Sequence, residues 1–201
     1  HYRHKDIQDA LFASSHHKCA FCECIPGESS HIEVEHFVPK SLYPDLAFEW
    51  DNLLPSCRRC NEEKSDADTR SNPIINPAIE DPEQLLTYSF LRIKPLAGSG
   101  QEHKAQQTID VCNLNCERLY KARSELMKSI TEYIDELKDK INWISEADTD
   151  QKRKIRITKL KNSIAVIESL TTAESAYSGY SKWFIQQCPE YQEAKRIVAS
   201  R

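Results

Sequence analysis

The chain has 201 residues and eight cysteines, and its 31 acidic residues outnumber its 27 Lys and Arg residues, which gives a net charge of −4. This length allows one domain or two small ones. A run of about 18 apolar residues, which a membrane-spanning helix needs, is absent, and no signal peptide is visible. Cysteines at metal-binding spacings in a long, charge-rich chain favour a reducing compartment, so we expect a cytoplasmic protein.

The first part of the chain predicts short elements of both kinds. Apolar residues at helical spacing predict a helix over residues 4–17. Ile32-Glu33-Val34-Glu35 alternates apolar and acidic residues, as a half-buried strand does. Leu53-Leu54 predicts a second short strand that ends at Pro55, and a helix is expected after residue 60.

The second part is predicted to be mostly helical. Residues 88–94 alternate and predict one strand. Apolar residues at steps of three and four then predict a long helix over 119–144 and a second over 157–167. The polar link at 148–150 between them indicates an antiparallel helical hairpin, and two short helices are expected on either side of Cys188-Pro189.

Two CxxC pairs lie on either side of the predicted strands. They are Cys19-Ala-Phe-Cys22 and Cys57-Arg-Arg-Cys60. Four thiolates from two such turns form the closed tetrahedral set that is typical of structural zinc. Redox pairs are the alternative, but the βαβ pattern that accompanies a redox CxxC is not visible. We therefore predict a structural Zn²⁺ bound by Cys19, Cys22, Cys57 and Cys60.

Glu35 and His36 lie side by side between the two cysteine pairs. Histidine is a common general base near neutral pH, because its ordinary pKa is about 6.5. A carboxylate is a suitable ligand for Mg²⁺ or Mn²⁺. Asn61 directly follows the second cysteine pair, and zinc binding would bring its amide oxygen toward Glu35 as a second ligand. A helix-capping role is the alternative for Asn61.

Three spaced motifs together resemble those of HNH endonucleases: Glu33-x-Glu35-His36-x-x-Pro39, Asp51-Asn52-Leu53 and Cys57-x-x-Cys60-Asn61-x-x-Lys64. The resemblance covers roughly residues 19–64 and implies a ββα-metal fold. It implies that His36 is the general base, that Glu35 and Asn61 hold a catalytic Mg²⁺ or Mn²⁺, and that Asn52 fixes the loop and the base. These four residues are therefore the candidate catalytic residues.

A wider resemblance connects residues 36–41, residues 47–53 and Ile75-Asn76-Pro77 with Asp81-Pro82 to the HNH nucleases of bacterial anti-phage operons. These are the PtuB type of Septu systems and some retrons. The resemblance implies an endonuclease that cleaves DNA, leaves a 5′-phosphate and works beside an ATPase partner, PtuA. The alternatives are a non-catalytic zinc-containing subunit that binds a partner, and a structural subunit whose helical hairpin makes the functional contacts.

The charge distribution bears on how DNA would bind. Residues 1–80 hold 8 Lys and Arg residues against 14 acidic residues, whereas residues 81–201 hold 19 against 17. A nucleic-acid-binding protein that acts alone usually has a basic surface, so we expect a complex that forms through the helices after about Pro95. The basic run 152–161 either contacts the DNA backbone or is a solvated helix face balanced by acidic residues across the hairpin. Candidate phosphate contacts are Arg58, Arg59, Lys40 and Lys64, for which solvated surface charge is the alternative.

The predicted fold class is α+β and mostly α. Residues 1–80 are expected to form a small zinc-stapled ββα-metal HNH core. Residues 81–201 are expected to form a helical region that contains the antiparallel hairpin and docks a partner.

Overall fold

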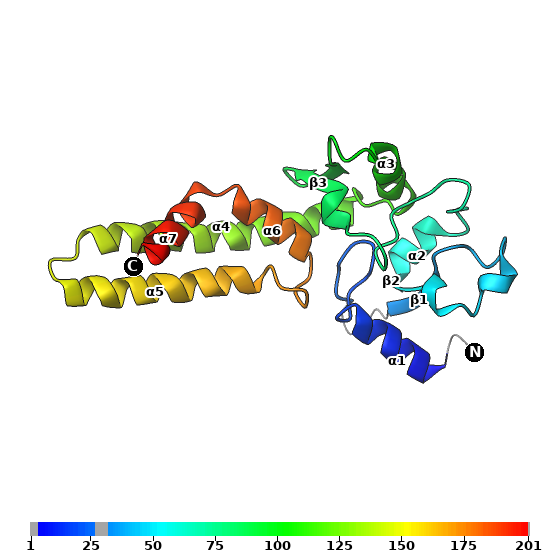
Figure 1. Cartoon of the computed structure of the whole chain (residues 1–201), viewed down its shortest axis with the longest axis horizontal. Helices are drawn as coiled ribbons and strands as arrows, with labels where there is room; N and C mark the ends of the chain where they lie inside the picture. Colours follow the sequence, from blue (N-terminus) through cyan, green and yellow to red (C-terminus); the bar gives the residue numbers. More distant parts are fainter. Residues whose placement is uncertain (1–3, 27–31, 201) are drawn as a thin grey trace. The chain divides into compact units, whose positions relative to one another are not determined.

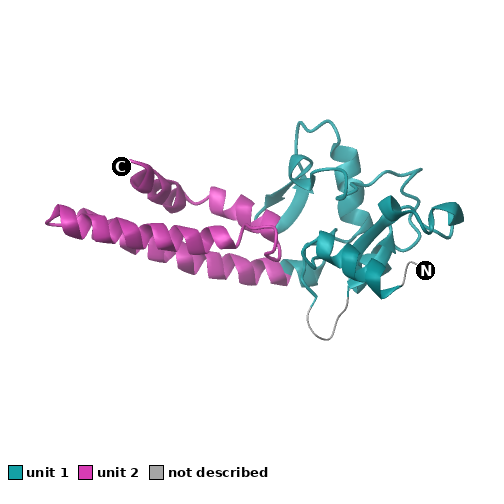
Figure 2. Cartoon of the chain, turned by 60° about the horizontal axis from the view of Figure 1, so that its bottom comes forward, with its two compact units in different colours: residues 1–120 teal, residues 121–201 magenta. Residues whose placement is uncertain are grey.

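The computed structural model describes residues 4–26 and 32–200. The chain divides into two compact units, unit 1 with residues 1–120 and unit 2 with residues 121–201 (Figure 2). The sequence predicts a nuclease core over residues 1–80 and a helical region over 81–201, whereas these compact units meet after residue 120. The reason is that the segment after residue 80 packs onto the first: Ile75 N donates to Thr108 Oγ1 at 2.8 Å, and Asn113 Nδ2 donates to Glu63 Oε1 at 3.1 Å.

Unit 1 contains the β-β-α arrangement expected from the sequence (Figure 1). After α1 (Lys5–Ser14), β1 (Ile32–His36) pairs antiparallel with β2 (Leu53–Cys57), so that Ile32 lies opposite Cys57 and His36 opposite Leu53. The helix α2 (Arg58–Lys64) follows at once, with Cys57 as its extended N-cap. Pro55 does not interrupt β2, because a two-stranded sheet leaves each strand one unpaired edge.

The rest of unit 1 lies partly in the loop between β1 and β2 and partly after α2. The loop contains two 3-10 turns, η1 (Pro44–Leu46) and η2 (Trp50–Asn52), and a third, η3 (Pro82–Gln84), follows α2. The next elements are β3 (Leu86–Ser89), β4 (Arg92–Pro95) and α3 (Glu102–Val111).

The single strand predicted over residues 88–94 is wrong, because β3 and β4 form an antiparallel hairpin. The turn between them places Phe90 at φ +58°. Gly and Asn are the usual residues in this left-handed region, so Phe90 gives no turn signal in the sequence.

Unit 2 is helical. The helix α4 (Glu117–Ser145) starts in unit 1 and continues into unit 2, where α5 (Asp150–Ser169), α6 (Ser178–Gln186) and α7 (Pro189–Ala199) follow. Helices α4 and α5 form the predicted antiparallel hairpin (Figure 1). The buried side chains of the unit's core are Ile130, Ile134, Leu137, Ile144, Ile157, Leu160, Ile164, Ile167, Ile185 and Ala194.

The mostly helical α+β fold class is thus confirmed. Within the described ranges, none of the helices combines the length and the apolar character that crossing a membrane requires.

Candidate active site and metal centre

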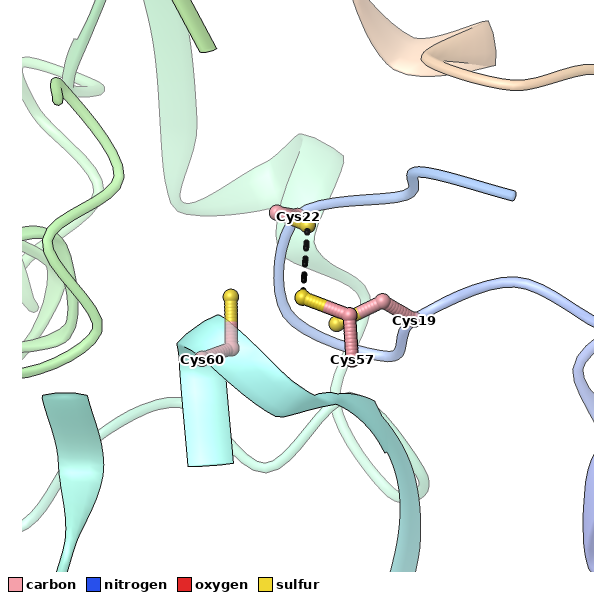
Figure 3. A group of neighbouring side chains, drawn as sticks. All are labelled: Cys19, Cys22, Cys57 and Cys60. Atoms are coloured by element: carbon pink, nitrogen blue, oxygen red, sulfur yellow. Dashed lines mark hydrogen bonds between the residues drawn. The ribbon is translucent and has the colours of Figure 1, made fainter. Parts of the chain in front are cut away.

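Two turns bring together the four cysteines that the sequence predicts as metal ligands. Cys19 and Cys22 lie in a tight turn after α1, in which Glu23 N donates to Cys19 O at 2.9 Å. Cys57 and Cys60 lie at the start of α2. All four are buried, and their Sγ atoms lie within 4.8 Å of one another (Figure 3).

The spacing of these sulfur atoms fits a tetrahedral zinc site. A Zn–S bond of about 2.3 Å places the corners of a tetrahedron about 3.8 Å apart, and Cys22 Sγ lies 3.8 Å from Cys57 Sγ. A set of four thiolates leaves no position for water or substrate, which is the property of a structural site. The backbone adds a second connection, because Ala20 N donates to Pro55 O at 2.8 Å. The cluster therefore joins the first turn to the junction of β2 and α2.

Arg118 adds a positive charge to the cysteine cluster. It lies in the first turn of α4, and its Nη2 is 3.9 Å from Cys22 Sγ and 4.0 Å from Cys57 Sγ. Four thiolates around a divalent cation carry a net negative charge, which a guanidinium at this distance offsets in part. Arg118 is not among the residues predicted from the sequence, because nothing in its local sequence indicates a neighbour 61 residues or more away.

His36, the predicted general base, is the last residue of β1 and is buried. Its Nε2 lies 3.0 Å from Ala47 O. Because a carbonyl oxygen only accepts, Nε2 carries the proton and the neutral ring has its lone pair on Nδ1. Burial lowers the pKa of His36, and the hydrogen bond to Ala47 opposes this shift. The environment therefore favours the neutral imidazole that a general base requires.

Glu35 forms a buried ion pair with Lys64. Lys64 Nζ lies 2.6 Å from Glu35 Oε1, and the two side chains are 0% and 6% exposed, respectively. The same Nζ donates to His36 O at 2.9 Å. Burial raises the pKa of Glu35, and the charge of Lys64 acts in the opposite direction.

The structure thus corrects one prediction about phosphate binding. Lys64 is not a surface residue that could contact a phosphate; its ammonium group neutralises Glu35 inside the protein.

Asn61 also contacts β1, but through the carboxylate of Glu33 and not that of Glu35. Its Nδ2 donates to Glu33 Oε2 at 2.6 Å. Glu33 and Glu35 are two residues apart on β1, so they lie on one face of the strand, and α2 contacts both. Glu33 is not among the predicted site residues, although its spacing from Glu35 is visible in the sequence.

Among the described residues no hydrogen bond joins the predicted cation ligands Glu35 and Asn61, which pair with Lys64 and Glu33 instead, but their chemistry fits the role. An amide whose Nδ2 donates to Glu33 presents Oδ1 as an acceptor, and a carboxylate that accepts one bond from Lys64 has further lone pairs. Mg²⁺ is commonly held by one or two protein oxygen ligands together with water and substrate phosphate.

Asn52 holds the two ends of the loop that follows β1. Its Oδ1 accepts from Val38 N at 2.7 Å, and its Nδ2 donates to Val38 O at 3.0 Å and to Leu46 O at 3.1 Å. Ala47, whose carbonyl orients His36, comes directly after Leu46. These contacts are the ones expected of a residue that fixes both the loop and the base.

The other predicted phosphate contacts, Arg58, Arg59 and Lys40, are exposed. Arg58 Nε donates to Glu62 Oε1 at 2.7 Å on the same helix, and the two side chains are 72% and 48% exposed. Exposed pairs of this kind contribute little to stability, so a phosphate can compete with Glu62 for Arg58.

Comparison with known proteins agrees with this geometry. Residues 19–67 match the model of the HNH endonuclease family. The matched segment includes β1, β2, α2 and the cysteine cluster, as well as the candidate catalytic residues. The predicted resemblance to HNH endonucleases is confirmed.

Similarity to individual proteins extends beyond this segment. The chain is 43% identical over 110 residues to a Septu protein PtuB of Bacillus thuringiensis, which covers 54% of this chain and 41% of the relative. It is 26% identical over 159 residues to a Septu protein PtuB of Bacillus mycoides (strain KBAB4), which covers 64% of this chain and 53% of the relative. Protein ea31 of Escherichia phage lambda is 43% identical over 53 residues, 26% of this chain and 17% of that protein. The predicted similarity to PtuB proteins is confirmed, and the chain spans about half the length of these two PtuB relatives.

Proposed function

We propose that the chain is a metal-dependent HNH endonuclease that cleaves phosphodiester bonds in DNA. One observation carries this proposal: a buried His36, oriented by Ala47, lies beside Glu35 in a β-β-α unit that matches HNH endonucleases. A zinc-containing subunit that only binds a partner has no need for this pair of buried titratable residues. The nuclease is therefore favoured over the non-catalytic alternative.

The geometry supports a simple division of roles. His36 Nδ1 takes a proton from a water molecule, whose oxygen attacks phosphorus as the bond to the 3′-oxygen breaks. The leaving 3′-oxygen takes up a proton from solvent, so the products are a 5′-phosphate and a 3′-hydroxyl, which is the polarity implied by the HNH resemblance. Ala47 O stabilises the imidazolium that results, because it accepts the hydrogen bond from Nε2. Glu35 and Asn61 would hold a Mg²⁺ or Mn²⁺, which would supply charge stabilisation for the phosphoryl group and the leaving oxygen.

The cysteine cluster has a separate task in this proposal. The four thiolates would hold a Zn²⁺ that fixes the start of α2 against the first turn and takes no part in the chemistry.

The test compares His36→Ala with His17→Ala, an exposed histidine outside β1. Both variants are expected to retain the parental fold and zinc content. Loss of a general base lowers the cleavage rate by about 10²–10⁴-fold, so only His36→Ala should lose activity. Glu35→Ala should also fail, but excess Mn²⁺ should restore it in part. A folded, zinc-loaded His36→Ala that cleaves plasmid DNA at the parental rate would exclude the proposed mechanism.

We also propose that the chain acts in a complex with an ATPase of the PtuA type, and that unit 2 makes the contact. Unit 1 carries 12 Lys and Arg residues against 19 acidic residues, so it repels DNA overall. Unit 2 carries 15 against 12. The two relatives named Septu protein PtuB support a role in the same type of system.

Helix α5 is the part of unit 2 that best fits a protein partner. Besides its buried stripe, it has Ile155 and Val166, each 48% exposed. These residues are eleven positions apart and therefore lie on one helix face. Two exposed apolar side chains among the basic residues of this helix suit a protein partner with an acidic surface better than a DNA backbone, which offers no apolar contact. The basic residues of α5 are Lys152, Arg153, Lys154, Arg156, Lys159 and Lys161.

The test uses the full chain and a purified ATPase of the PtuA type. The double variant Ile155→Glu/Val166→Glu should lose binding in a pull-down, whereas Thr131→Glu on the exposed face of α4 should bind as the parent does. The partner proposal fails if the double variant binds normally and the isolated chain cleaves DNA efficiently at physiological salt.

A further inference from the structure

The Lys64 side chain is 0% exposed, although Lys is rarely buried completely. It lies in the last turn of α2 and reaches the end of β1. Its Nζ makes two contacts there, one with Glu35 Oε1 at 2.6 Å and one with His36 O at 2.9 Å. One ammonium group thus contacts both residues at the centre of the proposed chemistry, the carboxylate through its side chain and the histidine through its backbone.

Two simpler roles do not account for these contacts. A phosphate-binding lysine has to reach solvent, and Lys64 does not. A residue that only fills the core would be apolar, because buried ion pairs can often be replaced by apolar side chains without loss of stability. The buried charge of Lys64 is therefore better explained by the two groups that it binds, the Glu35 carboxylate and the His36 carbonyl.

We propose that Lys64 is a positioning residue of the catalytic centre, one that fixes the Glu35 carboxylate and the backbone at His36. This inference rests on the proposed nuclease function. Glu35 ends in a flexible side chain, and the bond from Nζ to Oε1 holds that carboxylate against α2. The bond to His36 O holds the last peptide of β1 at the same time. DNA affinity is left to exposed residues such as Lys40.

The first experiment compares Lys64→Met with Lys40→Met. Displacement of a reacting group by about 1 Å can cost about 10²-fold in rate, so Lys64→Met should lower kcat by that order and leave KM for DNA unchanged. In a His36→Ala background, which should bind DNA without cutting it, the salt dependence of binding should also stay at the parental slope. Lys40→Met should instead raise KM and reduce the salt slope by about one, as loss of a phosphate contact does.

Lys64→Arg serves as the conservative variant. It keeps the charge and the donors, so it should recover part of the kcat lost in Lys64→Met. A Lys64→Met protein that cleaves at the parental rate, or that changes the salt slope as Lys40→Met does, would overturn the proposal.

A double-mutant cycle in urea unfolding covers the case in which Lys64→Met folds poorly. Glu35→Gln/Lys64→Met removes both charges and keeps the side-chain volumes, so it should be more stable than the sum of the single losses predicts. Additive losses would overturn the proposed pairing. This cycle does not depend on cleavage, so it is separate from the test of the proposed function: a parental chain that cleaves no DNA even with an ATPase of the PtuA type present would refute the function whatever the cycle shows.

Discussion

Replacement of Asn52 by alanine tests how the loop after β1 is held. Asn52 is buried, and its amide makes three hydrogen bonds, two with Val38 and one with Leu46. A hydrogen bond contributes about 0.5–1.5 kcal/mol net, and a buried donor left without a partner costs about 1–3 kcal/mol. The part-buried backbone N–H of Val38 would lose its acceptor in this variant. Since water can recover part of the loss, Asn52→Ala should lower the free energy of unfolding by about 2–4 kcal/mol.

The same substitution should lower activity in protein that remains folded. Leu46 precedes Ala47, whose carbonyl accepts from His36 Nε2. If the loop is no longer held at Leu46, this carbonyl no longer fixes the tautomer and the direction of the imidazole. Cleavage should therefore fall even at temperatures at which the variant is fully folded.

The assay is urea unfolding at constant zinc, together with cleavage of plasmid DNA at low temperature. Asn72→Ala is the matched control, because Asn72 is exposed and surface substitutions usually change stability by less than about 0.5 kcal/mol. An Asn52→Ala protein as stable and as active as Asn72→Ala would refute the proposed role of the loop.

Three further predictions concern the metal centre and the general base. Cys57→Ser should yield insoluble protein, because zinc binding contributes about 10–16 kcal/mol in small structural sites; soluble parental protein without zinc by elemental analysis would contradict this. Arg118→Ala should release zinc to a colorimetric chelator several-fold faster than the parent, whereas Lys121→Ala should release it at the parental rate. Equal release rates for Arg118→Ala and the parent would show that Arg118 does not stabilise the zinc site. Burial lowers the pKa of the His36 imidazole in the folded protein. The cleavage rate should therefore stay constant as the pH falls below about 6.5, the ordinary pKa of histidine, and should decline only when the pH reaches the lowered pKa of the folded state. As the pH falls, the unfolded chain binds a proton at His36 before the folded chain does, so the free energy of unfolding should decrease between the ordinary pKa and the lowered pKa of His36. A cleavage rate that already falls above pH 7 would contradict the assignment of His36 as the general base.

Features set by spacing along the chain were predictable. The two CxxC pairs predicted the cysteine cluster, because two short turns with the right ligands leave few other arrangements. The β-β-α order followed from alternation on either side of those turns, and the helical hairpin followed from apolar residues at steps of three and four. In each case the signal lies within a few neighbouring residues.

Features that depend on distant contacts were not predictable. Lys64 reads as a surface charge in the sequence, and only the packing of α2 on β1 shows that it is buried against Glu35, 29 positions earlier. Arg118 reaches Cys22 across 96 positions. The boundary at residue 120 depends on similar contacts, among them the bond from Ile75 to Thr108.

The short helix α2 connects the metal centre to the proposed chemistry. It has seven residues, and isolated helices shorter than about 12–15 residues are marginal in water, so its position depends on what binds it at each end. Cys57 and Cys60 fix its beginning through the cysteine cluster, and Lys64 fixes its end through Glu35. Asn61 lies between the two and reaches Glu33 on the same strand. Removal of zinc should therefore abolish cleavage although the zinc takes no part in the reaction, because the helix that carries Asn61 and Lys64 would lose its first attachment.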